Sequence, residues 1–222
     1  MILLFPVFLI PPLIHRKGNY ISFKAITLWS YLFSFFNRII YKKSGQEHLR
    51  KDEHYVFVVN HTSFLDTPAL PQIINGPFRA LAKKELTKIP IFGFLIKVVT
   101  VVVDRSSPAD RQKSKDRLND VLKNESSIVV FPEGTMNRTS NPLQPFYDGA
   151  FRIAIDAQVK ILPVVIRGAA KLMKPSSFMI KPGKVYVDIL PPIDAAAYEQ
   201  KNLPDLKKRV RESMLQSLTK SS

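Results

Sequence analysis

The stretch of residues 55–67, which reads YVFVVNHTSFLDT, guides the interpretation of the whole chain. Its first five residues are β-branched or aromatic without a polar break, a pattern typical of a strand buried on both faces of a parallel sheet. Polar residues follow at the end of this strand, and His61 is among them. Thr62 and Ser63 can cap a helix that begins there, which puts Asp66 in its first or second turn. The stretch therefore predicts a strand-to-helix junction at which a His and an Asp lie close together.

His61 and Asp66 are candidates for acid–base chemistry. Ligands of open α/β folds bind at the carboxyl ends of the strands, where this junction is expected. A neutral imidazole held by a carboxylate is suited to act as a general base. The same spacing also occurs by chance, as a surface hydrogen bond or at a helix start, so the HxxxxD pattern needs support from neighbouring strands.

Length and composition favour one α/β domain. The chain has 222 residues, enough for one substantial core. It contains no cysteine, which excludes structural disulfides, thiolate metal sites and a cysteine acyl-enzyme. His15, His48 and His54 show no metal-ligand spacing with His61, which argues against a metal hydrolase. We expect neither a metal nor a redox cofactor.

The charge of the chain predicts a polyanionic partner. The formal net charge is +15, which suits either a nucleic acid or an anionic lipid surface. Apolar residues make up 45% of the chain and concentrate near its amino end. This favours an anionic membrane surface over nucleic acid as the partner. A basic nucleic-acid-binding protein is the alternative of a different class, and it predicts salt-sensitive binding to DNA or RNA.

The first 44 residues are predicted to be a membrane-association segment, and residues 45–222 the catalytic domain. Residues 1–14 are almost wholly apolar but too few to span a bilayer, which needs about 20 helical residues. Residues 20–41 are predicted to form a helix in the membrane interface, on the cytoplasmic face, with a broad apolar surface. The alternatives are a helix packed on the domain and a tilted span paired with the first segment. Its polar stripe consists of Lys24, Thr27, Tyr31, Ser34, Arg38 and Tyr41.

The remaining pattern predicts a mostly parallel central sheet flanked by helices, an α/β fold. Apolar runs bounded by turn residues indicate further strands at 78–82, 97–103, 127–131, 161–166 and 184–190. Helices are expected at 107–124, where Ser107 would be the cap, at 150–157, and from about 204 to the carboxyl end.

Charged residues follow two further predicted strands. Arg105 comes after the strand at 97–103, and Glu133, Gly134 and Thr135 come after the strand at 127–131. Arg105 would bind an anion, and the glycine turn would let backbone amides approach a substrate oxygen or phosphate. The plainer alternatives are a surface ion pair for Arg105 and helix capping for Glu133.

Four motifs in this order resemble those of the glycerolipid acyltransferase family. Residues 60–66 (NHTSFLD) are similar to its first motif, residues 103–105 (VDR) to its second, residues 131–135 (FPEGT) to its third and residues 161–164 (ILPV) to its fourth. Residues 82–86 (AKKEL) and 89–93 (IPIFG) resemble the spacer between the first two motifs. The resemblance covers residues 45–190.

This resemblance implies acyl transfer from acyl-CoA or acyl carrier protein to the free hydroxyl of a lysophospholipid. The expected acceptor is 1-acyl-glycerol-3-phosphate, which would give phosphatidic acid; glycerol-3-phosphate and a lyso-aminolipid are the alternatives. His61 would be the base and Asp66 would orient it. The expected substrate-binding residues are Asn60, Lys83, Arg105, Glu133, Gly134, Thr135 and Arg138.

The third motif departs from the family pattern. The family usually continues it with Arg and Ser, whereas Thr135 is followed by Met136 and Asn137, and an arginine comes only at Arg138. The family also often has a basic residue where this chain has Asp148. Arg105, which follows a buried strand and matches the second motif, is the leading candidate for the acceptor phosphate. Arg138 is a candidate to compensate for the missing arginine, and a plain solvent-exposed arginine is the alternative.

Overall fold

One sheet of seven strands organises the part of the chain that the computed structural model describes, residues 18–74, 76–83, 100–103, 107–177 and 179–220. Its order is β1-β7-β6-β2-β5-β3-β4, and every neighbouring pair is parallel except β6 and β7. The strands are β1 (Ile39–Ser44), β2 (Val56–Val59), β3 (Phe78–Lys83), β4 (Thr100–Val103), β5 (Ser127–Val130), β6 (Ile161–Arg167) and β7 (Gly183–Ile189). The central position of β2 places residues 60–66 in the middle of the sheet's carboxyl edge.

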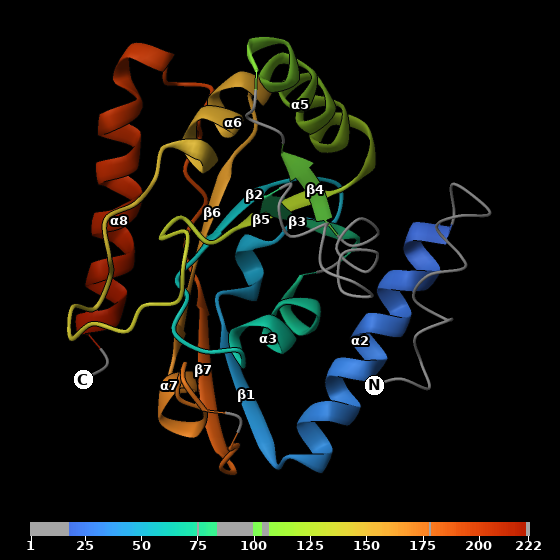
Figure 1. Cartoon of the computed structure of the whole chain (residues 1–222), viewed down its shortest axis with the longest axis vertical. Coiled ribbons are helices and arrows are strands. Elements are labelled where there is room, and N and C mark those ends of the chain that lie inside the picture. Colours follow the sequence, from blue (N-terminus) through green and yellow to red (C-terminus); the bar gives the residue numbers. More distant parts are fainter. Residues whose placement is uncertain (1–17, 75, 84–99, 104–106, 178, 221–222) are drawn as a thin grey trace.

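Helices cover both faces of the sheet (Figure 1). Helices α5, α6 and α8 lie along one face, and α2 and α3 lie along the other. The helices are α2 (Gly18–Phe36), α3 (Asp66–Ile73), α5 (Pro108–Asp120), α6 (Gly149–Ala157), α7 (Ala169–Leu172) and α8 (Leu203–Thr219). A π-helical turn, η4 (Val121–Glu125), continues α5, and η2 (Gln46–His48) and η5 (Gln200–Asn202) are short 3-10 helices.

Strand β2 contributes to both halves of the core. Val56 and Val58 pack with the cluster under α5, α6 and α8, whereas Phe57 and Val59 pack with the cluster under α3. All four side chains are buried, as expected for a central parallel strand. The predicted α/β fold with a mostly parallel sheet is confirmed.

The predicted helix over residues 20–41 is wrong at its carboxyl end. Helix α2 ends at Phe36, and Arg38 takes a left-handed conformation with φ of 53°. The chain then turns into β1, which pairs in parallel with β7. Ile39 and Tyr41 are buried on the α2 side, so these apolar residues complete a sheet rather than a membrane helix.

Helix α2 also presents its polar side to the protein. Thr27 donates to the carbonyl oxygen of Pro71 at 3.3 Å, and Gln72 donates to the hydroxyl oxygens of Ser30 and Ser34 at 2.7 and 2.9 Å. Ser30 and Ser34 are buried. Thr27 and Ser34 of the predicted polar stripe are therefore part of the surface that joins α2 to α3.

No helix among the described residues is long and apolar enough to cross a membrane. The apolar segment at residues 1–14 lies outside the described residues, as does the start of the predicted strand at 97–103. The predicted division of the chain between residues 44 and 45 stays a prediction.

Candidate active site

The side chains of His61 and Asp66 meet at the carboxyl end of β2. Nδ1 of His61 lies 2.9 Å from Oδ2 of Asp66, within hydrogen-bonding distance. The His61 side chain keeps 15% of its surface exposed, whereas that of Asp66 is fully buried. The buried carboxylate therefore holds one ring nitrogen of an imidazole that still reaches the surface.

Asp66 also organises the loop before its own helix. Its Oδ2 accepts hydrogen bonds from the backbone N–H groups of Thr62 and Ser63 at 2.6 and 2.8 Å. The predicted capping of this helix by Thr62 or Ser63 is therefore wrong. Helix α3 begins at Asp66 itself, preceded by Leu65 without a side-chain cap, because the acid reaches back to satisfy the loop amides. The predicted place of Asp66 in the first helical turn is confirmed.

The ring of His61 stacks on Phe131, the residue after β5. The ring centroids are 4.2 Å apart and the planes differ by 24°. Because Phe131 belongs to the neighbouring parallel strand end, the stack closes one face of the imidazole with an apolar wall. The orientation of His61 is thus set by Asp66 at its edge and by Phe131 on its face.

Glu133 holds the backbone of this site in place. Its Oε1 accepts from the N–H of His61 at 3.0 Å, and its Oε2 accepts from the N–H of Gln144 at 2.9 Å. Glu133 is 2% exposed. Burial raises its pKa above the ordinary value, and these two hydrogen bonds partly offset that effect. Each carboxylate oxygen of Glu133 accepts a hydrogen bond from a backbone N–H of the protein. The contact with the N–H of His61 therefore positions that residue.

Asn60 and Ser63 are likewise turned into the protein. The Asn60 amide donates to the carbonyl oxygen of Ile166 at 2.9 Å and accepts from its N–H at 2.7 Å. The Ser63 hydroxyl donates to the carbonyl oxygen of Met173 at 2.7 Å and is fully buried. Asn60 thereby joins the end of β2 to β6, and Ser63 joins the His61 loop to the end of α7.

Gly134, Thr135 and Arg138 lie on the exposed loop after β5. The N–H of Gly134 is used inside the turn, where it donates to the carbonyl oxygen of Phe131 at 3.0 Å. Gly134 has φ of +72°, and a Cβ there would lie 2.8 Å from the ring of Tyr147. The next part of the loop is fixed to the site, because the N–H of Asn137 donates to the carbonyl oxygen of His61 at 2.7 Å.

Two predicted site residues fall outside this description. Arg105 lies outside the described residues, and for Lys83 the structure describes the backbone of β3 but not the side chain. Their predicted roles stay predictions. No group of three or more His, Cys, Asp or Glu side chains that could hold a metal ion is found among the described residues.

Tyr41 is a residue of the site that the sequence did not indicate. It extends from β1, and its hydroxyl donates to the carbonyl oxygen of Leu65 at 2.8 Å. Burial raises the pKa of this hydroxyl well above its ordinary value, and the nearby charge of Asp66 raises it further. Tyr41 was missed because it was assigned to a helix; the run IIY after Asn37-Arg38 was the available signal of a strand.

This α/β fold, with a His–Asp pair at the carboxyl edge of its sheet, is found in a known class of enzymes. The family model described as Acyltransferase matches residues 40–167. The chain belongs to the acyltransferase family.

Similar proteins are found among curated sequences and solved structures. The 1-acyl-sn-glycerol-3-phosphate acyltransferase of Saccharomyces cerevisiae is 33% identical over 80% of this chain and 59% of its own length. The alpha form from Homo sapiens is 30% identical over 96% of this chain and 76% of its own length. The crystal structure of the 1-acyl-sn-glycerophosphate (LPA) acyltransferase PlsC from Thermotoga maritima is 25% identical, with a TM-score of 0.78 over 96% of this chain and 86% of that chain. The chain thus spans about three fifths of the length of the yeast relative.

Proposed function

We propose that this protein transfers a fatty acyl group to the free hydroxyl of 1-acyl-glycerol-3-phosphate and so makes phosphatidic acid. The donor is a thioester, acyl-CoA or acyl carrier protein. The observation that carries the proposal is the 2.9 Å contact between His61 Nδ1 and Asp66 Oδ2 at the edge of the sheet. The names of the relatives support the choice of acceptor.

His61 acts as the general base in this mechanism. Because Asp66 Oδ2 accepts three hydrogen bonds, it holds His61 in the tautomer with the proton on Nδ1. The Nε2 lone pair is then free to take the proton of the acceptor hydroxyl. The hydroxyl oxygen attacks the thioester carbonyl carbon and forms a tetrahedral oxyanion. Collapse of this intermediate breaks the carbon–sulfur bond, and the leaving thiolate takes the proton from the imidazolium.

Direct attack by the acceptor is favoured over an acyl-serine intermediate. Ser63, the serine nearest to His61 in sequence, is fully buried and donates to Met173. Its hydroxyl oxygen also accepts from the N–H of Leu65 at 3.2 Å. A thioester is already activated, so the mechanism calls on no cofactor besides the donor itself.

Arg105 is proposed to hold the acceptor phosphate. It matches the second family motif, and a guanidinium can bind two phosphate oxygens at once. Arg138, exposed on the loop that Asn137 fixes to His61, is the residue proposed to compensate for the missing arginine at position 136. Lys83 is the alternative. Glu133 acts by positioning His61 rather than by touching substrate, since both of its oxygens are occupied.

Helix α2 is proposed to hold the enzyme on a membrane, where its lipid substrate resides. Exposed apolar and aromatic residues recur along α2 at helical spacings of three and four, a stripe suited to the membrane interface. Its members are Leu28 (58% exposed), Tyr31 (50%), Leu32 (40%), Phe35 (75%) and Phe36 (77%). Contiguous exposed apolar surface of this kind marks an interaction site. We assign the stripe to the cytoplasmic face of a bilayer.

Incubation of the purified protein with acyl-CoA or acyl carrier protein tests this function. The acceptors are 1-acyl-glycerol-3-phosphate, glycerol-3-phosphate and a lyso-aminolipid, and the products are identified by mass spectrometry. We expect phosphatidic acid as the main product. A main product from another acceptor would replace the proposed substrate, and no acylated product from any of them would reject the proposed activity.

A further inference from the structure

Four exposed lysines surround the segment that joins α7 to β7. They are Lys171, Lys174, Lys181 and Lys184. The described ion pairs include none of them, and the sequence contains no acidic residue between Asp156 and Asp188. No acidic residue close in sequence therefore neutralises the positive charge of this segment.

Apolar side chains lie among these lysines. Met179 is 75% exposed between Lys174 and Lys181 in sequence. On the adjoining edge of the sheet, Ile40 is 51% exposed and pairs in register with Lys184. Tyr186, which is 46% exposed, pairs with Lys42 in the same way. Paired residues of neighbouring strands point to the same face, so Lys184 with Ile40 and Lys42 with Tyr186 share the face of this edge opposite to Ile39 and Tyr41. Ammonium groups beside apolar side chains are a combination that fits lipid phosphates above acyl chains.

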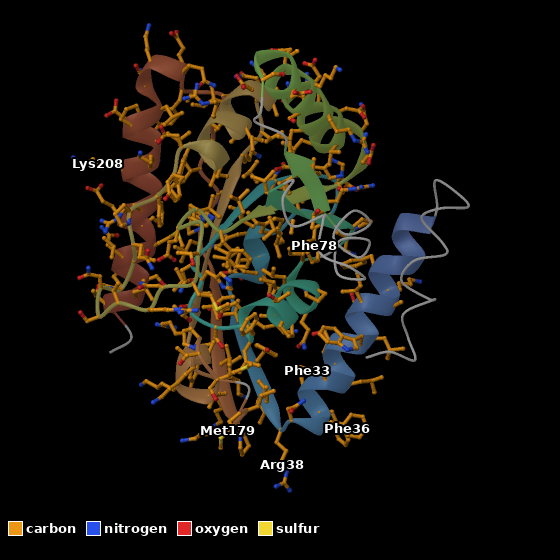
Figure 2. All side chains as sticks on the ribbon, viewed as in Figure 1. Phe33, Phe36, Arg38, Phe78, Met179 and Lys208 are labelled. Atoms are coloured by element: carbon orange, nitrogen blue, oxygen red, sulfur yellow. The ribbon has the colours of Figure 1, made fainter. Side chains whose placement is uncertain are left out.

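This surface adjoins the carboxyl end of α2. The N–H of Gly183 donates to the carbonyl oxygen of Arg38 at 3.1 Å, which joins the start of β7 to the turn after α2. Figure 2 shows Phe36, Arg38 and Met179 at the same end of the molecule, with Lys208 far from them. The lysine segment therefore adjoins the carboxyl end of α2, where Phe36 is exposed.

The lysine segment is also connected to the candidate active site. The carbonyl oxygen of Met173, which directly precedes Lys174, accepts the 2.7 Å hydrogen bond from the Ser63 hydroxyl. Ser63 follows His61 by two residues. A membrane contact at this segment would therefore lie one hydrogen bond away from the catalytic loop.

We propose that residues 171–177 and 179–184, with the exposed ends of β1 and β7, form a second contact with the bilayer, specific for anionic phospholipid. The lysines bind headgroup phosphates and Met179 inserts among the acyl chains near the interface. The proposal rests on the membrane association proposed for α2 and adds lipid selectivity to it. A basic contact beside the carboxyl end of α2 would restrict rotation about the helix axis, which a single helix would leave free.

Vesicle co-sedimentation tests the lysine contribution. The variant Lys174→Ala/Lys181→Ala/Lys184→Ala is compared with the control Lys113→Ala/Lys123→Ala/Lys208→Ala, which removes the same charge from exposed lysines of α5, η4 and α8. On vesicles of phosphatidylcholine with phosphatidylglycerol, the first variant should bind about a hundredfold more weakly than the wild type, at about fivefold for each lysine. The control variant should bind within a few-fold of the wild type.

The lipid composition separates this proposal from the one for α2. On phosphatidylcholine alone, the wild type and the variant lacking three lysines of the segment should bind equally, through α2. Equal loss in both lysine variants on anionic vesicles would overturn the proposal, because net charge alone would then explain binding. Failure of the wild type to bind either vesicle would instead reject the association proposed for α2.

A fluorescent probe tests insertion directly. The chain has no cysteine, so Met179→Cys or Lys208→Cys accepts a single environment-sensitive label. With anionic vesicles we expect a blue shift and increased intensity for the label at position 179 and neither for the label at 208. An unshifted label at position 179 on protein that co-sediments with these vesicles would overturn the proposal.

Discussion

The carboxylate of Glu133 accepts a hydrogen bond of 3.0 Å from the backbone N–H of His61, across the ends of two neighbouring parallel strands. Its other oxygen accepts from the N–H of Gln144 at 2.9 Å. One buried acid therefore ties the catalytic loop to the loop that follows β5. The carbonyl oxygen of His61 is held as well, by the N–H of Asn137 at 2.7 Å. His61 is thus restrained through its backbone as well as its ring.

Glu133→Gln should impair the positioning of His61. The amide supplies one acceptor in place of two, and its NH₂ group must face a backbone N–H. We expect the free energy of unfolding to fall by about 1–3 kcal/mol. Turnover should fall about 10- to 100-fold through misplacement of His61, with little change in either KM. The control is Asp148→Asn, the same chemical change at an exposed acid. A raised acceptor KM with unchanged kcat would show that Glu133 binds substrate instead.

His61→Ala should reduce kcat by about 10²- to 10⁴-fold without unfolding the protein, because it removes the base. Circular dichroism would check the fold, and single-turnover acyl transfer the rate. Near-normal turnover in the folded variant would contradict the mechanism.

The variant Asp66→Asn removes the negative charge of this side chain and keeps its shape. All three hydrogen bonds that Asp66 accepts go to Oδ2, so an amide oxygen can take that place. Oδ1 is buried and has no partner among the described residues, so the NH₂ group would be unsatisfied there and cost about 1–3 kcal/mol. Activity should fall severely while the fold persists, because the imidazolium loses its counter-charge. Asp52→Asn, at an exposed acid, is the matched control, and equal activities in the two variants would count against the role of Asp66.

Phe35→Ser/Phe36→Ser should weaken binding to neutral vesicles by about a hundredfold, because two exposed rings no longer enter the bilayer. Tyr147→Ser, which removes an exposed ring from the loop after β5, is the control. Point variants are preferred to removal of residues 1–41, because that truncation would delete Ile39 and Tyr41 from the core. Unchanged binding of the double variant would rule out the apolar stripe as the membrane contact.

Arg105→Ala should raise the KM for 1-acyl-glycerol-3-phosphate about 10- to 100-fold and leave the KM for the donor nearly unchanged, because it removes a charged hydrogen-bond donor. Arg138→Ala should do the same if Arg138 compensates at the phosphate. Arg152→Ala, at an exposed arginine on α6, is the control. Unaltered acceptor kinetics in Arg105→Ala would move the assignment to Lys83 or Lys84.

Gly134→Ala should strain the loop in two ways. The left-handed φ disfavours any side chain, and the new methyl group meets the ring of Tyr147. We expect a loss of about 1–2 kcal/mol in the free energy of unfolding. Adding Tyr147→Ala should restore only the part of this free energy that is lost through the contact between the new methyl group and the ring. A double-mutant cycle measures that coupling, and strict additivity would show that the ring moves aside without cost.

The sequence predicted the sheet wherever a strand is buried on both faces. The run at residues 55–59 has no polar break, and neither has the run at 128–131, because helices cover both sides of these strands. The inward residues of α8 were predictable as well, since Leu206, Val210 and Met214 recur at helical spacing and are all fully buried. The contact of His61 with Asp66 followed from their places on a strand end and in the next helical turn.

The missed features depend on partners far away in sequence. Strand β1 extends the apolar pattern of α2 without a strong break, and only its pairing with β7 distinguishes it from a helix. The inward turn of Ser30 and Ser34 depends on Gln72, which the local pattern of α2 does not contain. The role of Glu133 as an acceptor for His61 likewise requires the register of two strands. Periodicity reports local amphipathy and carries no information on such pairings.

The pairing of β1 with β7 also has a consequence for biosynthesis. β1 ends at Ser44, and its only neighbour in the described sheet begins at Gly183. At about 5–20 residues per second, translation reaches β7 about 7–28 s after β1 is made. During that interval β1 emerges from the ribosome with no sheet edge to join, and the apolar residues Ile39 and Tyr41, which pack in the finished core, are left exposed. Early lipid contact would shield these apolar residues from aggregation while the nascent chain waits for its last strand.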